Sequence, residues 1–438
     1  MTTSNNDSMK NGNFFECYSK FVKKALSLLS SYLKGGEMVK EKLEKIYWVV
    51  DDNTYGSDIV SKPDYFGFIR KHKEALQIMQ EYKDCLLIMQ NDPILSKHIG
   101  KLVGTGQSKI RRDDWHYLSY GLVSLFEYYH KNQQLDENLL RTLYGNLEKS
   151  LYSDSIPMVY TAPLHNFESD VDLVDLGNGL SIRKITVQEK EFLLNADLYN
   201  LLRSDVVQLK YLIECKQEEK KLFENEVAIE SAEVPDKIIN NVQTTLRLYK
   251  EGIVGYNIIS RTAAFKNPVI GEVVTISGLT RRSFMGSLYI LNEAEIPEFR
   301  RFWDAVKKIT LSEKDPLKVA IRRFNFAYER ELPEDRIIDY MISYEALLFK
   351  EGETGELVYK LSNRVSRLLA QTFADRKRIT KEIQDFYKVR SQVVHGETIG
   401  NYGNLALMES YLRRLIKIFL EKSLVETHDQ IIEHLDWD

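Results

Sequence analysis

The sequence has few cysteines, and no long apolar run occurs in it. Its 438 residues include only Cys17, Cys85 and Cys215, which are odd in number and far apart in the chain. This distribution argues against a framework of disulfides and against a cysteine-based zinc site, and it suits a reducing cytosol. No apolar run approaches the roughly 18 to 20 residues that a membrane-spanning helix needs. Because the polar N-terminus also lacks the layout of a signal peptide, we expect a cytoplasmic protein without membrane segments.

The chain also lacks an excess of either charge. Sixty Lys and Arg residues oppose 64 Asp and Glu residues, which gives a formal net charge of −4. Bulk attraction to a polyanion is therefore excluded, and any contact with nucleic acid must come from a local patch. Apolar residues make up 43% of the chain and charged residues 28%, as in ordinary globular proteins, and the length favours two or three domains.

Proline is absent from the last part of the chain. None follows Pro333, and the glycines in this part lie between segments with helical periodicity. The pattern predicts four helices with short connections, at 333–350, 355–373, 375–395 and 404–424. Such helices are typical of an antiparallel bundle.

The chain divides into four regions by pattern. We expect a disordered tail (1–13), a mostly helical N-terminal region (14–165), an α+β region (166–290) and a helical domain (291–438). The fold class would then be mainly α, with a C-terminal antiparallel helical bundle preceded by an α+β middle region and a helical N-terminal region.

Strand patterns occur at several places before the bundle. A β-rich run followed by a turn occupies 44–56, and alternation around Gly-Asn-Gly predicts a hairpin at 171–186. Two further β-rich runs, 206–216 and 267–278, flank a polar stretch at 217–236 that we interpret as a surface loop or hairpin edge. The glycine-containing segment 100–109 does not fit the spacing of a phosphate-binding loop.

The third predicted helix ends in the sequence YKVRSQVVHG, which contains Arg390 and His395. Five residues separate positions by about 140° on an ideal helix, so the two side chains share a face only if the last turn loosens. Gly396 is a suitable end for the helix. We therefore expect a loosened last turn from which both side chains reach one concave site beyond the helix.

This pair of residue types fits cleavage of RNA. A neutral imidazole can take the proton from a ribose 2′-OH, and a guanidinium can hold the phosphate oxygens while negative charge builds on them. The nucleophile is the hydroxyl of the RNA itself, so no metal or other cofactor is required. The expected products are a 2′,3′-cyclic phosphate and a 5′-OH, and DNA is not a substrate.

The surroundings of the pair favour an anionic ligand. Residues 360–396 carry nine Lys or Arg residues and three Asp or Glu residues, and we name Arg364, Arg367 and Lys388 as candidate RNA contacts. Glu345, within an apolar helical run, is placed to orient Arg390. Ser391 is a supporting residue rather than a nucleophile, because no Asp/His relay surrounds it.

Simpler interpretations stay open for the same residues. Basic residues at a helix end can bond the last carbonyl groups, and a basic run is commonly a solvated helix face. Glu345 can equally be a half-buried partner of an arginine that serves stability. The remaining histidines lack metal-ligand partners at useful spacing, and we expect them to be structural or exposed: His72, His98, His116, His130, His165, His428 and His434.

Three phrases in order resemble the HEPN superfamily, and specifically its Apea-like branch. They are the EALL helix at Glu345–Leu348, Asn363-Arg364 on the next helix, and the run from Arg390-Ser391 to His395-Gly396. The resemblance covers about 290–438, and more weakly 179–193. Catalytic members often carry Asn, Asp or His directly after the arginine, where this chain has Ser391.

The resemblance implies a metal-independent endoribonuclease that acts as a homodimer, with paired motifs facing one another across the two-fold axis. Members often serve in phage defence or toxin–antitoxin systems, so a defence-system partner protein is also expected. The first alternative is a non-catalytic HEPN module for dimerisation or nucleic-acid binding. A weaker one is an accessory or neutralising protein in such a system.

Overall fold

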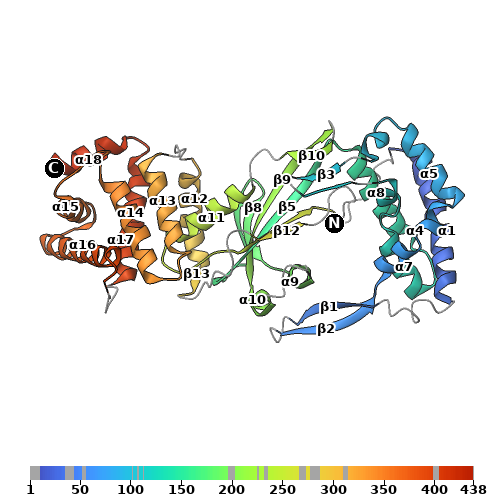
Figure 1. The fold of residues 1–438 in the computed structure, drawn as a ribbon, viewed down its shortest axis with the longest axis horizontal. Coiled ribbons are helices and arrows are strands. Elements are labelled where there is room, and N and C mark those ends of the chain that lie inside the picture. Colours follow the sequence, from blue (N-terminus) through green and yellow to red (C-terminus); the bar gives the residue numbers. More distant parts are fainter. Residues whose placement is uncertain are drawn as a thin grey trace.

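The computed structural model describes most of the chain, with gaps. The described residues are 10–34, 44–51, 56–100, 102–105, 108–111, 113–195, 203–223, 226–230, 235–265, 273–276, 287–308, 314–397 and 404–437. They are mostly helical, with a sheet region in the middle of the chain, as the mainly α fold class predicts. Figure 1 shows an elongated arrangement, with helices at both ends and the sheet between them. Among these residues, no helix combines the length and hydrophobicity that crossing a bilayer requires.

Helices dominate the N-terminal region. They are α1 (Gly12–Lys34), α3 (Tyr65–Lys71), α4 (Lys73–Gln77), α5 (Gln80–Asn91), a 3₁₀ turn (Leu95–His98), α6 (Asp114–Leu118), α7 (Leu122–Asn132) and α8 (Glu137–Tyr152). The apolar residues of α1 recur at helical spacing and are buried, for example Tyr18, Phe21 and Val22. Because α1 begins at Gly12, it enters the predicted tail, most of which (1–9) lies outside the described residues.

Two hairpins interrupt these helices. The strand expected near 44–56 is present as β1 (Glu44–Asp51), which pairs with β2 (Gly56–Pro63). The segment 100–109 contains β3 (Leu102–Thr105) and the start of β4 (Ser108–Arg111), which form a second hairpin. The N-terminal region is therefore less purely helical than its periodicity indicates.

The middle region is built on a sheet of nine described strands. Its order is β12-β11-β5-β9-β10-β3-β4, with the β7–β8 hairpin attached beside β9. The middle-region strands are β5 (Ser155–Leu164), β7 (Leu173–Gly177), β8 (Leu180–Lys184), β9 (Tyr211–Phe223), β10 (Glu226–Glu230), β11 (Ile258–Ala263) and β12 (Val273–Ile276). A separate parallel pair joins β6 (Phe167–Ser169) to β13 (Tyr289–Leu291).

The predicted hairpin at 171–186 is confirmed. Asn178 and Gly179 form the turn between β7 and β8 with positive φ angles of 52° and 75°. A Cβ atom at position 179 would lie 2.9 Å from the carbonyl oxygen of Lys216. Glycine is therefore required there both for the positive φ angle and for the missing Cβ atom.

The other β-rich runs differ in detail from their patterns. The run at 206–216 becomes a strand only from Tyr211, because Val206 and Val207 belong to α10 (Arg203–Gln208). Of 267–278, the structure describes the strand β12. Within 217–236, β10 pairs with the second half of β9, but the expected edge position is wrong because β10 also pairs with β3.

Two more helices complete the middle region. These are α9 (Val187–Asn195), which contacts β1, and α11 (Pro235–Tyr249), which the sequence analysis of this α+β region did not predict. Figure 1 shows α11 between the sheet and the C-terminal helices. Leu246 of α11 belongs to the core of the N-terminal and middle regions, whereas Leu248 belongs to the core of the C-terminal helices. Helix α11 therefore joins the two cores.

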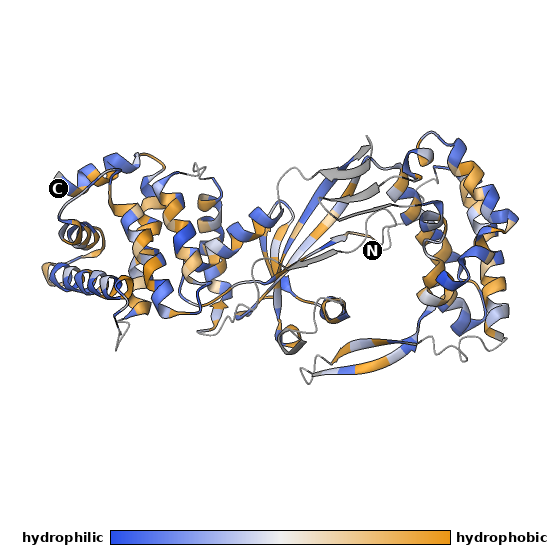
Figure 2. Ribbon diagram, in the orientation of Figure 1, coloured by the Kyte–Doolittle hydropathy of each residue, from blue (hydrophilic) through white to orange (hydrophobic). Residues whose placement is uncertain are grey.

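The four helices predicted after Pro333 are confirmed. They are α14 (Pro333–Leu348), α15 (Leu357–Leu369), α16 (Phe373–Val394) and α17 (Leu405–Lys422). The same helical domain also contains α12 (Ile296–Val306), α13 (Pro316–Ala327) and α18 (His428–Trp437). Figure 2 shows apolar residues along α14 and α17, in the interior of this domain, whereas α16 is mostly hydrophilic.

A buried cluster of polar side chains lies where α11 meets α13, α14 and α17. Arg413, only 4% exposed, donates through Nε to the carbonyl oxygen of Arg247 (2.8 Å) and through Nη2 to the hydroxyl of Tyr328 (2.8 Å), and it pairs with Glu409. The hydroxyls of Tyr328 and Tyr340 donate to the Glu409 carboxylate at 2.6 and 2.8 Å. The charges of Arg413 and Glu409 compensate each other only while both residues are present.

Replacement of Arg413 by Met should lower the free energy of unfolding of the helical domain by about 3–5 kcal/mol. The reason is that the mostly buried Glu409 loses its closest cation and keeps only the longer pair with Arg336, at 3.5 Å. The measurement is urea unfolding followed by circular dichroism. Arg378→Met is the matched control on the surface of the same domain, where we expect a loss below about 1 kcal/mol. Equal losses in the two variants would contradict this account of the cluster.

Candidate functional site

The candidate site lies on α16, a 22-residue helix on the surface of the C-terminal domain. Thr372 caps its N-terminus by accepting a hydrogen bond from the backbone N–H of Asp375. One narrow face, with Ile379, Ile383 and Phe386, is buried against the domain. The rest of the helix is exposed or half-buried, which explains its hydrophilic sequence.

Helical order continues without interruption through the end of the motif. The N–H of His395 donates to the carbonyl oxygen of Ser391 (3.1 Å), as in a regular helix. Gly396 has a φ of +69°, and the N–H groups of Gly396 and Glu397 donate to the carbonyls of Val393 (3.1 Å) and Gln392 (3.0 Å). This is a Schellman ending. Gly396 thus ends the helix as predicted, but the expected loosening of the last turn is wrong.

Arg390 and His395 of one chain consequently point to different sides. At about 100° per residue, Arg390 projects between the directions of Ile383 and Phe386, toward the domain, and His395 projects about 140° away. Arg390 is half-buried and lies 5.8 Å from the ring centre of Tyr387, whereas His395 is exposed. A single chain therefore does not gather the two side chains in one concave site.

Glu345 of α14 lies close enough to Arg390 to interact with it electrostatically. Burial raises the pKa of the Glu345 carboxyl, and the positive charge of Arg390 lowers it by a smaller amount. The structure shows no hydrogen bond or ion pair between the two. Glu345 and Arg390, which the sequence analysis linked, therefore lie near each other without a direct bond between their side chains.

In the part of the chain that the structure describes, Arg390 and His395 donate no side-chain hydrogen bond and join no ion pair. Other arginines of the domain behave differently: Arg364 and Arg413 are fully engaged with carboxylates and carbonyls. The guanidinium of Arg390 and the imidazole of His395 thus retain their capacity to bind an anion.

Arg364 of α15, which the sequence analysis named as a candidate RNA contact, is buried inside the domain. It is 2% exposed, pairs with both carboxylate oxygens of Glu353 (2.8 Å each) and of Asp436 (2.9 and 2.8 Å), and donates to the carbonyl of Leu348. These bonds use its five N–H groups and tie the end of α14 to α15 and α18. An RNA contact by Arg364 stays untested, but its position favours a structural role.

The other expected RNA contacts divide between interior and surface. Arg367 is half-buried and donates to the carbonyl of Leu435 in α18. Lys388 is exposed on the outer face of α16. Ser391 is half-buried, and its described contact is the helical bond from its carbonyl to His395. Of the basic candidates, Lys388 is the one placed for a ligand.

The outer face of α16 carries a row of cations that leads to His395. Lys377, Lys381, Lys388 and His395 are exposed and project within about 40° of one another. Of the acidic residues of α16, Asp375 and Glu382 fall outside this row and pair with Arg378, whereas the exposed Asp385 borders the row, one turn from Lys381 and from Lys388. The sequence analysis counted these charges but did not sort them by face, which the 3.6-residue period would have allowed.

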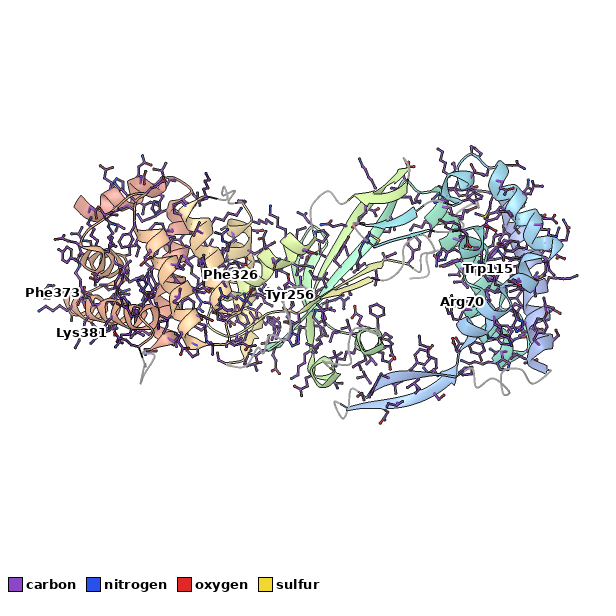
Figure 3. The ribbon with its side chains drawn as sticks, viewed as in Figure 1. Arg70, Trp115, Tyr256, Phe326, Phe373 and Lys381 are labelled. Carbon is purple, nitrogen blue, oxygen red and sulfur yellow. The ribbon has the colours of Figure 1, made fainter. Side chains whose placement is uncertain are left out.

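An exposed aromatic ring begins this row. Phe373 is 72% exposed, and the ammonium of Lys377 lies 4.8 Å from its ring centre. Figure 3 shows Phe373 and Lys381 at the end of the molecule, where both side chains point away from it. An exposed ring followed by cations suits a single-stranded nucleic acid, whose bases stack and whose phosphates pair with lysine.

Histidines elsewhere take up structural positions. The Nε2 atoms of His98 and His428 lie 3.0 and 2.9 Å from the carbonyl oxygens of Leu151 and Leu347. Within the described ranges, no three His, Cys, Asp or Glu residues are grouped so that they could hold a metal ion.

Comparisons with protein-family models, with curated proteins and with solved structures found nothing that matches this chain. The resemblance to the HEPN superfamily therefore rests on the motif residues alone.

The Arg364 cluster gives the domain a specific dependence on pH. Hydrogen bonds from Arg364 lower the pKa of the Glu353 carboxyl to about 2. Because the folded-state pKa is depressed, the ionised carboxylate stabilises the fold above about pH 4.5, and this stabilisation is lost as the pH falls toward 2. We expect the urea midpoint of the wild type to fall more steeply over this range than that of Glu353→Gln. Parallel pH profiles would contradict the assignment.

Proposed function

We propose that the protein is a metal-independent endoribonuclease that cuts RNA at a site shared by two copies of the C-terminal domain. One observation carries the proposal: Arg390 and His395 lie in the last turns of one ordered helix and on different sides of it, and among the described residues neither side chain is held by a hydrogen bond or an ion pair. The proposal also uses the resemblance of the motif phrases to the HEPN superfamily. By the same resemblance, we propose a cytoplasmic role in phage defence or a toxin–antitoxin system.

The chemistry is a transesterification within the RNA. His395 of one copy accepts the proton of the 2′-OH, and O2′ forms a bond to the adjacent phosphorus while the bond from phosphorus to O5′ breaks. The leaving 5′ oxygen takes up a proton from water, and the proton held by His395 passes back to the solvent, so that each cleavage needs one His395 and one Arg390. The products are the 2′,3′-cyclic phosphate and a 5′-OH, and the nucleophile needs no metal.

Arg390 stabilises the charge that builds on the phosphate oxygens in the transition state. A guanidinium is always protonated and offers two parallel N–H groups to a phosphate. Glu345 lies near enough to Arg390 to interact with it electrostatically and so to bias its orientation. Glu345 is thus a positioning residue.

The geometry of α16 favours two copies over one. Since Arg390 and His395 of one chain diverge by about 140°, a second α16 is needed to bring an imidazole beside each guanidinium. The lysine row on the outer face supplies affinity that does not depend on RNA sequence.

A second candidate function is a non-catalytic HEPN module that dimerises or binds nucleic acid. The half-buried position of Arg390 and the serine at position 391 favour it. Both candidates keep the lysine row as an RNA contact, but only the first requires His395 for bond cleavage.

Replacement of His395 by Ala should abolish RNA cleavage, because the general base is lost, with a fall of at least about 100-fold in rate. The measurement is electrophoresis of a labelled single-stranded RNA with identification of the 2′,3′-cyclic phosphate end. An RNA with one 2′-deoxyribose at the cleaved position should resist the wild type at that position.

The matched control is His434→Ala, an exposed histidine on α18 of the same domain. It should leave cleavage unchanged. Full activity of His395→Ala would refute the catalytic role, and wild-type protein that binds RNA without cutting it would support the second candidate.

Removal of Lys381 and Lys388 should weaken RNA binding through the loss of phosphate contacts. Each lysine should reduce the slope of log affinity against log salt by about 0.7, so the double alanine variant should lose about 1.4. The measurement is fluorescence anisotropy with a 2′-deoxy-substituted, uncleavable oligonucleotide. Lys83→Ala, on an exposed position of α5, removes a cation from the other end of the molecule and should leave the slope unchanged. An unchanged slope in the double variant would remove α16 from the binding surface.

A further inference from the structure

Two of the three cysteines lie together in the folded chain. The Sγ atoms of Cys17 on α1 and Cys85 on α5 are 3.0 Å apart, although 68 positions separate them in the sequence. The odd number of cysteines and their separation in sequence argued only against a framework of disulfides. The packing of α1 on α5 is what places them in contact.

The neighbouring contacts fix this register. One turn after Cys17, the ring of Phe21 packs edge-on against Tyr82 with centroids 5.4 Å apart, and Lys24 pairs with Glu81 at 3.7 Å. Contacts that run forward along α1 and backward along α5 show that the helices are antiparallel. The two thiols therefore face each other across an ordered helix pair, and not through a chance approach of mobile loops.

The two thiols differ in accessibility, as an attacking and a resolving cysteine must. Cys17 is partly exposed, and its thiol points toward the carbonyl of Glu81 (3.7 Å). Cys85 is fully buried. A small reagent reaches Cys17 first, and Cys85 is then the one thiol in position to complete the bond.

We propose that Cys17 and Cys85 form a reversible disulfide when the protein meets a low-molecular-weight disulfide such as oxidised glutathione. The thiolate of Cys17 attacks one sulfur of the reagent, its S–S bond breaks, and one glutathione thiolate leaves. The thiolate of Cys85 then attacks Sγ of Cys17, the Cys17–Cys85 bond forms, and the second glutathione leaves. The two protons of the cysteines pass to the two glutathione thiolates.

The exchange should be slow at neutral pH. Burial raises the pKa of the Cys17 thiol, and it raises that of Cys85 further. Since the thiolate is the nucleophile, the rate increases with pH through the alkaline range.

The bond would close a loop that contains the β1–β2 hairpin. This hairpin reaches the middle region, where the Asn195 side chain on α9 bonds the N–H (2.8 Å) and the carbonyl (2.9 Å) of Trp48. Oxidation thus joins the two ends of a segment whose strand β1 contacts α9. Disulfides that close long loops restrict the unfolded chain strongly, so the N-terminal helices should resist heat better in the oxidised form.

The test is incubation of the full-length protein with oxidised glutathione at pH 8.5. We expect an intact mass lower by two hydrogens, a Cys17–Cys85 peptide after non-reducing digestion, and a thermal midpoint raised by roughly 5–10 °C. Dithiothreitol should reverse all three changes. Cys17→Ser should prevent the mass loss, whereas Cys215→Ala, which removes the thiol on β9, should not.

Cys85→Ala provides an independent variant that keeps a small apolar side chain in the core. It should stop at the mixed disulfide, with one glutathione retained on Cys17. The proposal fails if the wild type also stops there, if Cys17 links two chains instead, or if the folded protein stays unmodified while protein unfolded in urea is oxidised.

Discussion

The structure depends on the buried charges around Glu409 of α17. On one side of α17, Glu409 and Arg413 hold α11, α13 and α14 together, and Arg413 reaches the backbone of Arg247 in the helix that joins the two cores. On another side, the Tyr411 hydroxyl donates to Glu382 of α16 at 2.7 Å and accepts from Arg378 at 2.9 Å. One turn of α17 therefore connects the sheet region to the helix that carries the candidate site. Because the hydrogen bonds among Arg413, Glu409 and Tyr328 are directional, this cluster specifies one arrangement of the helices more strongly than apolar packing alone.

Part of this organisation follows from the sequence. The missing prolines and the placement of glycines predict α14 to α17, because nothing in that stretch interrupts an apolar helical period. The Gly-Asn-Gly turn predicts β7–β8, because it supplies the positive φ angles of a tight hairpin. Helix α11 is missed because it lies among strands, and because its buried Arg247 and Gln243 make it look polar in the sequence. Polar residues that are paired inside a core cannot be told from surface residues by pattern.

The sequence likewise predicts some features of the candidate site and not others. Sequence spacing locates Arg390, His395 and the helix end at Gly396, and it links Glu345 to Arg390. It does not reveal that the guanidinium of Arg364 is hydrogen-bonded to Glu353 and Asp436, because these two residues lie far from Arg364 in the sequence or on another helix. Nor does it foresee that the last turn stays regular. Under the proposed function that regularity is the main constraint, because it separates the guanidinium and the imidazole of one chain and so calls for a second chain.

The most direct test of the shared site is complementation between two inactive variants. Arg390→Ala and His395→Ala are purified separately, mixed under conditions that exchange subunits, and assayed for RNA cleavage, with mixed dimers counted by native mass spectrometry. The account predicts that each variant alone is inactive and that cleavage returns in proportion to the mixed dimers, because these retain one intact Arg390 and one intact His395 from different chains. Mixed dimers that form in quantity and stay as inactive as their parents would contradict it.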